Sequence, residues 1–163
     1  MKTLYILRHA KSSWEEPEKD DVDRALISRG ITDAKAVAKR LQNELEKLDL
    51  IISSPANRAV HTAIIFCITA NIPTKKIQIQ TEIYESSEST MLKLIKSIPD
   101  EHDNVMLVGH NPTVTYFVNN FLENPLDNIP TSGVVGLTFD TDDWKNISKD
   151  KLKSYSFDYP KKG

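Results

Sequence analysis

The order of apolar and polar positions along this chain predicts strands and helices in alternation. Residues 2–8 form an apolar run rich in branched and aromatic side chains, which is typical of a buried strand. Residues 32–48 instead place apolar side chains three and four positions apart, which is the spacing of an amphipathic helix. The same patterns predict further strands near residues 49–53, 77–81, 105–108, 134–139 and 153–157, and further helices over 54–70 and 91–98 and through Phe117 and Phe121.

Strands that alternate with amphipathic helices are typical of a mostly parallel sheet with helices on both faces. We therefore predict a three-layer α/β/α sandwich. The chain has 163 residues, 39% of them hydrophobic, which is enough for one hydrophobic core. We find no internal repeat, low-complexity tract or long linker, so we predict one domain over residues 1–163, with residues 161–163 as a frayed tail.

Charge and composition narrow the classes of partner. The 21 basic and 23 acidic residues give a formal charge of -2, so we expect neither a nucleic acid nor an anionic membrane surface as partner. No stretch approaches about 18 apolar residues and no leader pattern is present, so we expect a cytoplasmic protein.

The single cysteine, Cys67, lies in an apolar stretch that favours a buried, unreactive thiol. The histidines lack metal-ligand spacing, so we expect no metal and no cofactor.

Three predicted strands are followed by arginine or histidine side chains. Arg8 and His9 follow the first strand, Arg58 comes shortly after the second, and His110 follows the fourth. Because the carboxyl ends of parallel strands lie at one edge of a sheet, these side chains can converge. Together with helix N-termini they would form a phosphate pocket, since arginine donates paired hydrogen bonds to phosphate oxygens and keeps its charge.

These segments resemble the sequence blocks of a known family, the histidine phosphatase superfamily, which has the phosphoglycerate mutase-like fold. The blocks occur in the family's order and span nearly the whole chain. The short chain and the residues around the first loop resemble the SixA-like phosphohistidine phosphatase branch. The matching segments are residues 7–10 (LRHA), 53–62 (SSPANRAVHT) and 108–111 (VGHN) for the superfamily, and 8–14 (RHAKSSW), 23–26 (DRAL) and 29–30 (RG) for the branch.

The resemblance implies a metal-independent phosphatase and a role for each matched residue. His9 would be the nucleophile, forming a phosphohistidine intermediate that water then hydrolyses. Ala10 departs from the superfamily signature, which has glycine there, and this removes the freedom of positive φ. The phosphoryl oxygens would be held by Arg8, Arg24, Arg58 and His110, with Asn111 as a peripheral contact.

The general acid is the least defined part of the predicted site. Many superfamily members supply a carboxylate after the third strand, where this chain has Glu82, Glu85 and Glu88. Glu85 is the best placed of them, although acids in a polar loop are also typical of a solvated face. A phosphohistidine leaving group can be protonated on its own imidazole, so a weak or absent acid favours phosphohistidine as the substrate.

Three classes of function remain open from the sequence. The leading one is a phosphatase that acts on protein phosphohistidine, such as that of a histidine-phosphorylated signalling protein. The second is a phosphatase of small phosphorylated metabolites, and the third is a non-catalytic phosphoprotein-binding module. The presence of Arg8, His9, Arg58 and His110 disfavours the third.

Two features around the predicted pocket each allow two interpretations. Trp14 fits either a rim aromatic or structural packing, and the acidic loop 15–23 either is solvated or selects against highly anionic substrates.

Overall fold

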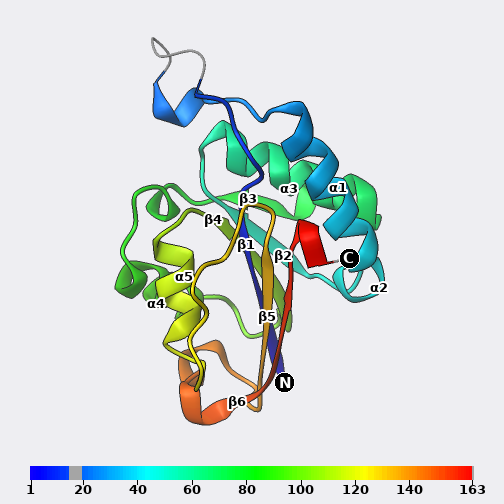
Figure 1. Cartoon of the computed structure of the whole chain (residues 1–163). Helices are drawn as coiled ribbons and strands as arrows, with labels where there is room; N and C mark the ends of the chain where they lie inside the picture. Colours follow the sequence, from blue (N-terminus) through cyan, green and yellow to red (C-terminus); the bar gives the residue numbers. More distant parts are fainter. Residues whose placement is uncertain (15–19, 163) are drawn as a thin grey trace.

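Six strands form one sheet in the computed structural model, which describes residues 1–14 and 20–162. The strand order is β3-β2-β4-β1-β5-β6 (Figure 1). The pairs from β3 to β1 are parallel, and β5 runs antiparallel to both of its neighbours, so the predicted mostly parallel sheet is confirmed. The strands are β1 (Lys2–Arg8), β2 (Leu50–Ser53), β3 (Ile77–Ile79), β4 (Asn104–Gly109), β5 (Val134–Phe139) and β6 (Leu152–Asp158).

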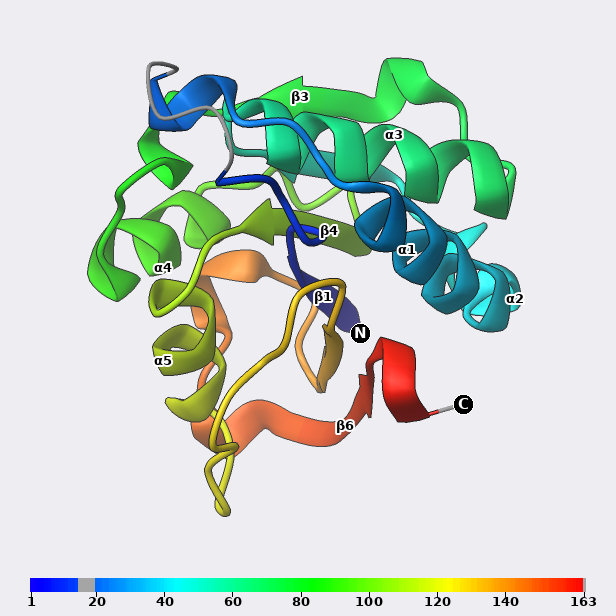
Figure 2. The same ribbon diagram turned by 45° about the horizontal axis from the view of Figure 1, so that its top comes forward.

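Helices cover both faces of this sheet (Figure 1, Figure 2). Alternate side chains of β1 point to opposite faces, so Ile6 joins the core beneath α4 and α5, and Leu7 joins the core beneath α1 and α3. This arrangement confirms the predicted three-layer sandwich. The helices are α1 (Ser28–Arg40), α2 (Gln42–Leu45) and α3 (Asn57–Ala70) on one face, and α4 (Glu88–Lys96) and α5 (Thr113–Asn119) on the other.

The helix predicted over residues 32–48 was wrong in its extent. It begins earlier, at Ser28, and the backbone leaves the helical conformation at Leu41, so that α1 ends and the short α2 follows. The pattern hides this break because Leu45 and Leu48, beyond it, are buried in the same core as Val37, before it. A regular apolar spacing therefore continues across two separate helices.

The helices after β2 and β4 also differ from their predicted ends. The first begins at Asn57 rather than at Ser54, because the backbone at Ala56 is not yet helical. The second, α5, ends at Asn119, and Phe121 lies in the following loop. Phe121 is nevertheless buried, in edge-to-face contact with Phe117 and Phe139 at ring distances of 5.4 and 5.1 Å.

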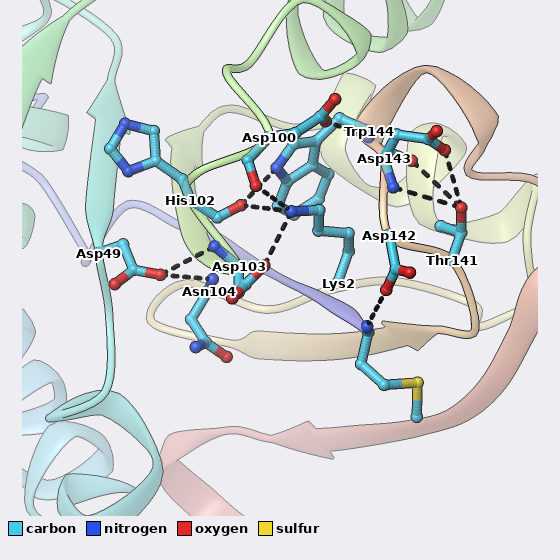
Figure 3. Close-up of polar contacts among 11 residues, drawn as sticks. Lys2, Asp49, Asp100, His102, Asp103, Asn104, Thr141, Asp142, Asp143 and Trp144 are labelled. Carbon is cyan, nitrogen blue, oxygen red and sulfur yellow. Dashed lines mark hydrogen bonds and ion pairs between the residues drawn. The ribbon is translucent and has the colours of Figure 1, made fainter.

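A buried lysine, Lys2, makes several hydrogen bonds at the end of the sheet where β1 begins (Figure 3). Lys2 Nζ donates hydrogen bonds to the carbonyl oxygens of Asp100, at 2.6 Å, and His102, at 3.1 Å, and to the Asp103 carboxylate at 2.8 Å. The indole N–H of the buried Trp144 donates to the same His102 carbonyl at 2.7 Å. These bonds hold the loop before β4 against β1, at the opposite end of β1 from Arg8.

Two further expectations from the sequence concern the cysteine on α3 and whether any helix could span a membrane. Cys67 on α3 is fully buried, which confirms the predicted buried thiol, and burial raises its pKa to about 11. None of the helices within residues 1–14 and 20–162 has the length and apolar character needed to cross a bilayer.

Candidate active site

The carboxyl ends of β1, β2 and β4 surround a pocket of about 440 Å³. Parallel pairing brings Arg8 at the end of β1 opposite Gly109 at the end of β4, with His9 and His110 next in each chain segment. This pocket is lined by every predicted site residue except Glu85. The pocket is lined by Arg8, His9, Lys11, Ser12, Trp14, Asp21, Arg24, Arg58, His110, Asn111 and Thr131.

His9 presents a neutral imidazole with one free nitrogen to this pocket. Its Nδ1 lies 2.7 Å from the carbonyl oxygen of Ala10, and because a carbonyl can only accept, Nδ1 carries the proton. The lone pair is therefore on Nε2. Burial, reinforced by the charges of Arg58 and Arg8, lowers the pKa of His9 to about 4, so the ring is neutral at pH 7. This is the protonation state that a histidine nucleophile requires.

The backbone around His9 is held by bonds from three other segments. The His9 N–H donates to the Gly109 carbonyl at 3.1 Å, and the Ala10 N–H donates to the Thr62 hydroxyl on α3 at 2.9 Å. The N–H of Ser132 lies 3.2 Å from the His9 carbonyl oxygen. Ala10 does not have a positive φ, so alanine is unstrained where the superfamily signature has glycine.

Three buried nitrogens at the pocket have no hydrogen-bond partner within the described residues. They are Nε of Arg8, Nε of Arg58 and Nδ1 of His110. Arg8 also donates from Nη1 to the carbonyl of Ile129 at 3.0 Å, which fixes its guanidinium while leaving Nε available. Buried donors without partners are costly, and three of them around one pocket match the needs of an anion with several acceptor oxygens, such as phosphate.

Ser54 orients His110 and was missed as a site residue, because sequence reasoning read it as a helix cap. Its hydroxyl accepts from the Ala56 N–H at 3.2 Å and lies 2.7 Å from His110 Nε2. Both groups are satisfied when the hydroxyl donates to Nε2, which leaves the His110 proton on Nδ1. Burial, together with the neighbouring His9 and Arg58, lowers the pKa of His110 to about 3. His110 is therefore a neutral hydrogen-bond donor, with its ring 5.2 Å from that of His9.

Asp21 joins the site although no sequence pattern indicated it. Its carboxylate accepts hydrogen bonds from Arg58 at 3.0 Å, Arg24 at 2.9 Å and the Tyr84 hydroxyl at 2.6 Å, and its carbonyl accepts a further bond from Arg58 at 2.7 Å. The Tyr84 hydrogen bond, with those from the arginines, lowers the pKa of Asp21 to about 2. Of the loop predicted at 15–23, residues 15–19 lie outside the described residues, and Asp21 is a fixed ion-pair partner rather than a merely solvated acid.

Trp14 forms an exposed wall of the pocket over Arg24. The Arg24 guanidinium carbon lies 3.4 Å from the centre of the Trp14 ring, a stacked cation-π contact, and its Nη1 donates to the Ser12 hydroxyl at 2.8 Å. The Trp14 side chain is nevertheless 77% exposed. Of the two alternatives from the sequence, the structure supports the rim aromatic.

Glu85 and Asn111 are placed differently from the other predicted site residues. Glu85 is exposed and lines an adjoining hollow of about 370 Å³, which shares Arg58 and His110 with the pocket but does not include His9. Asn111 does line the pocket, but its amide donates to Asn128 and to the Ile129 carbonyl, at 2.6 and 3.1 Å. Asn111 also accepts a hydrogen bond from Thr115 at 2.7 Å. Its side chain therefore holds the loop at 128–131 and offers no evident free donor to an anion.

Comparison with known proteins agrees with the fold. Residues 4–85 match the sequence profile of the histidine phosphatase superfamily (branch 1), and the chain belongs to this superfamily. Within it, the chain is SixA-like. It is 33% identical to SixA of Agrobacterium tumefaciens over 85% of this chain and 92% of that one, with a TM-score of 0.77. The Nakamurella multipartitia SixA structure, at 19% identity, shares the fold over 98% of this chain and 96% of that one, with a TM-score of 0.82.

A curated relative is also similar to this chain over almost its whole length. An uncharacterised protein of Mycobacterium leprae is 26% identical over 95% of this chain and all of that one. With the superfamily and the branch established, the chain is a phosphatase of the histidine phosphatase superfamily.

Proposed function

We propose that the chain, as a single catalytic domain of residues 1–163, removes the phosphoryl group from phosphohistidine in a protein substrate, through a phosphohistidine intermediate on His9. The observation that carries the proposal is the state of His9, whose free Nε2 shares a pocket with three unpartnered donors. A neutral imidazole nitrogen is a competent nucleophile toward phosphorus, and the donors match the oxygens of a phosphoryl group.

In the first step the lone pair of His9 Nε2 attacks phosphorus and the P–N bond to the substrate imidazole breaks. The electron pair of that bond goes to the substrate nitrogen. Arg8, Arg58 and His110 donate hydrogen bonds to the phosphoryl oxygens as charge spreads over them. The Nδ1–H bond to the Ala10 carbonyl stays in place and stabilises the positive charge on the phosphorylated ring. Water then attacks phosphorus, the bond to Nε2 breaks, and inorganic phosphate leaves.

The acids near the pocket favour phosphohistidine over the second candidate, small phosphorylated metabolites. The pKa of Asp21 is about 2, so at neutral pH its carboxylate has no proton to give, and Glu85 is exposed and does not line the pocket that holds His9. An alkyl phosphate needs an acid to protonate its leaving oxygen. The imidazole of phosphohistidine can take up a proton on its own second nitrogen, so it leaves without help from a carboxyl group.

The proposal is tested by turnover of a phosphohistidine-bearing protein beside p-nitrophenyl phosphate and a panel of phosphorylated metabolites. We expect the wild type to hydrolyse phosphohistidine fastest and His9→Ala to lose activity on every substrate. In the wild type, rapid acid-free quenching should trap the phosphoryl group on His9. His61→Ala is the matched control, because His61 is an exposed histidine on α3 outside the pocket, and it should keep full activity.

Two results would change the assignment. Activity retained in His9→Ala would remove His9 as the nucleophile. Turnover of metabolites without turnover of phosphohistidine would keep the chemistry of His9 and move the function to the second candidate.

A further inference from the structure

A second cavity, of about 360 Å³, adjoins the phosphate pocket and shares two wall residues with it. Lys11 and Thr131 line both hollows, so a molecule held in one can continue directly into the other. We call this second cavity the side pocket. Its remaining walls are Arg29 and Asp33 of α1, Pro130, and three residues near the end of the chain, Tyr159, Pro160 and Lys161.

The side pocket has an excess of positive charge in a chain whose formal charge is -2. Three of its walls are the cations Lys11, Arg29 and Lys161, and the only carboxylate among them is Asp33. Arg29 faces Asp33 at 3.7 Å, a long ion pair with an exposed arginine. Neither lysine forms an ion pair with a carboxylate within the part of the chain that the structure describes. The cavity therefore offers cationic groups that are not neutralised by the protein.

Both sides of the side pocket are fixed in place. On one side, Gly30 of α1 packs directly against the backbone of Lys11. On the other, Arg40 donates to the Asp158 carboxylate and to the Tyr159 carbonyl, each at 2.7 Å, and holds the chain end (red in Figure 1 and Figure 2) beside α1. The frayed tail predicted for residues 161–163 was wrong for 161 and 162. They belong to a 3-10 turn, and Nζ of the Lys162 side chain donates to the Phe157 carbonyl at 2.5 Å. Gly163 lies outside the described residues.

We propose that the side pocket binds a carboxylate side chain of the protein substrate, from an aspartate or glutamate within a few residues of the phosphohistidine. The proposal rests on the proposed function and adds a sequence preference to it. A substrate whose phosphoryl group lies beside His9 can extend from the phosphate pocket past Lys11 and Thr131, which line both hollows, into this cationic cavity. Charge complementarity selects an acidic occupant, because a basic one would face three like charges.

This assignment makes a quantitative prediction about substrate choice. The charges that line the side pocket are largely exposed, so each contributes modestly and is screened by salt. An acidic residue near the phosphohistidine should therefore raise kcat/KM about fivefold over a neutral one at low ionic strength, mainly through KM. At high salt the difference should shrink toward one, because the distance between exposed charges exceeds the screening length.

The experiment uses phosphohistidine peptides that are identical except for Glu, Gln or Lys at one to three residues on either side of the phosphohistidine. The variants are Arg29→Ala, Lys161→Ala and the charge reversal Lys161→Glu. The matched control is Lys35→Ala, an exposed lysine on α1 that lines neither pocket. In the wild type and the control, the Glu peptide should be the best substrate. Both alanine variants should lower this preference, and Lys161→Glu should shift it toward the Lys peptide.

The outcomes separate the side pocket from the proposed function. A wild type that hydrolyses the Gln and Glu peptides equally well overturns the side pocket and supports the proposed function. A wild type that hydrolyses none of the peptides overturns the proposed function and the peptide occupant with it. A preference for Glu that survives Lys161→Glu unchanged also overturns the assignment, since a purely structural role of Lys161 would not reverse with charge.

Discussion

Among single residues, Asp21 most affects how the phosphate pocket can bind a phosphoryl group. Its carboxylate takes hydrogen bonds from Arg58 and Arg24, two side chains that the family resemblance assigns to the phosphoryl group. Tyr84 adds a third bond and holds the carboxylate in place. A phosphoryl group entering the pocket therefore meets a fixed negative charge and competes with it for donors. The unpartnered Nε atoms of Arg8 and Arg58 remain available throughout.

Asp21→Asn should therefore strengthen inhibition by inorganic phosphate. The amide keeps the size and the acceptor oxygen of the carboxylate but removes a charge that repels the anion, an effect of about 1 kcal/mol in a solvent-exposed setting, or about a fivefold lower Ki. The measurement is competitive inhibition of p-nitrophenyl phosphate hydrolysis at pH 7. Asp23→Asn, an exposed acid two residues further on that does not line the pocket, should leave Ki unchanged. A higher Ki in Asp21→Asn would mean that the carboxylate mainly holds the arginines in position.

The contrast between His9 and Asp21 shows what the sequence could predict at this scale. Arg8 ends β1, and His9 and His110 directly follow β1 and β4. Parallel pairing brings the ends of those strands together, so the meeting of these side chains follows from the pattern. Asp21 and Tyr84 follow no strand or helix spacing, and they meet only because a loop folds across the strand ends. No local pattern encodes such a contact.

At the scale of elements, α1 packs directly against the backbone of the loop after β1. A Cβ atom added to Gly30 would lie 2.3 Å from the carbonyl oxygen of Lys11 and 2.9 Å from its nitrogen. Backbone atoms cannot move aside as the end of a side chain can. Only glycine allows α1 to approach this closely, and the approach sets the position of Lys11 and Ser12 at the wall of the phosphate pocket.

Gly30→Ala should destabilise the fold and reduce activity. Helix propensity alone predicts that replacing glycine within a helix stabilises it by about 1 kcal/mol. Forcing a methyl group into a filled space costs about 1–3 kcal/mol, so we expect a net loss on denaturant unfolding. The displaced loop should also lower kcat/KM by about tenfold, because small misplacements in a site are costly.

Thr32→Ala is the control for Gly30→Ala. Thr32 is exposed on the same helix, so this change should alter the free energy of unfolding by less than about 0.5 kcal/mol and leave activity intact. A Gly30→Ala protein as stable and active as the wild type would show that α1 moves without affecting the loop.

The helices show why it is easier to predict that a helix exists than to predict where it begins and ends. The apolar spacing over residues 32–48 correctly placed a helical segment over the core. It could not show the break at Leu41, because the side chains on both sides of it are buried in one cluster. The strands are better predicted, and β1 matches its predicted residues 2–8, because a buried strand is a continuous apolar run with polar residues at its end.

At the scale of the whole molecule, keeping the two pocket histidines neutral lowers the free energy of unfolding at acidic pH. The folded protein holds His9 and His110 neutral, with pKa values of about 4 and about 3, against an ordinary value of 6.5. Between pH 6.5 and about 4 the unfolded chain therefore binds more protons at these two positions than the folded chain does. The free energy of unfolding rises with pH when the unfolded state binds more protons, so it must fall as the pH drops through this window.

His9→Asn isolates the share of His9 in this pH dependence. At pH 8 the histidine is neutral in both states, so the variant and the wild type differ only by the change in packing and hydrogen bonding. At pH 5 the wild type alone loses stability at this position, and for a pKa of about 4 against 6.5 the loss is about 2 kcal/mol. From pH 8 to pH 5, the free energy of unfolding of the variant should therefore rise by about 2 kcal/mol relative to that of the wild type. The measurement is denaturant unfolding at both pH values. A difference that is the same at both pH values would mean that His9 keeps its ordinary pKa in the folded protein, so that burial does not hold the ring neutral below pH 6.5.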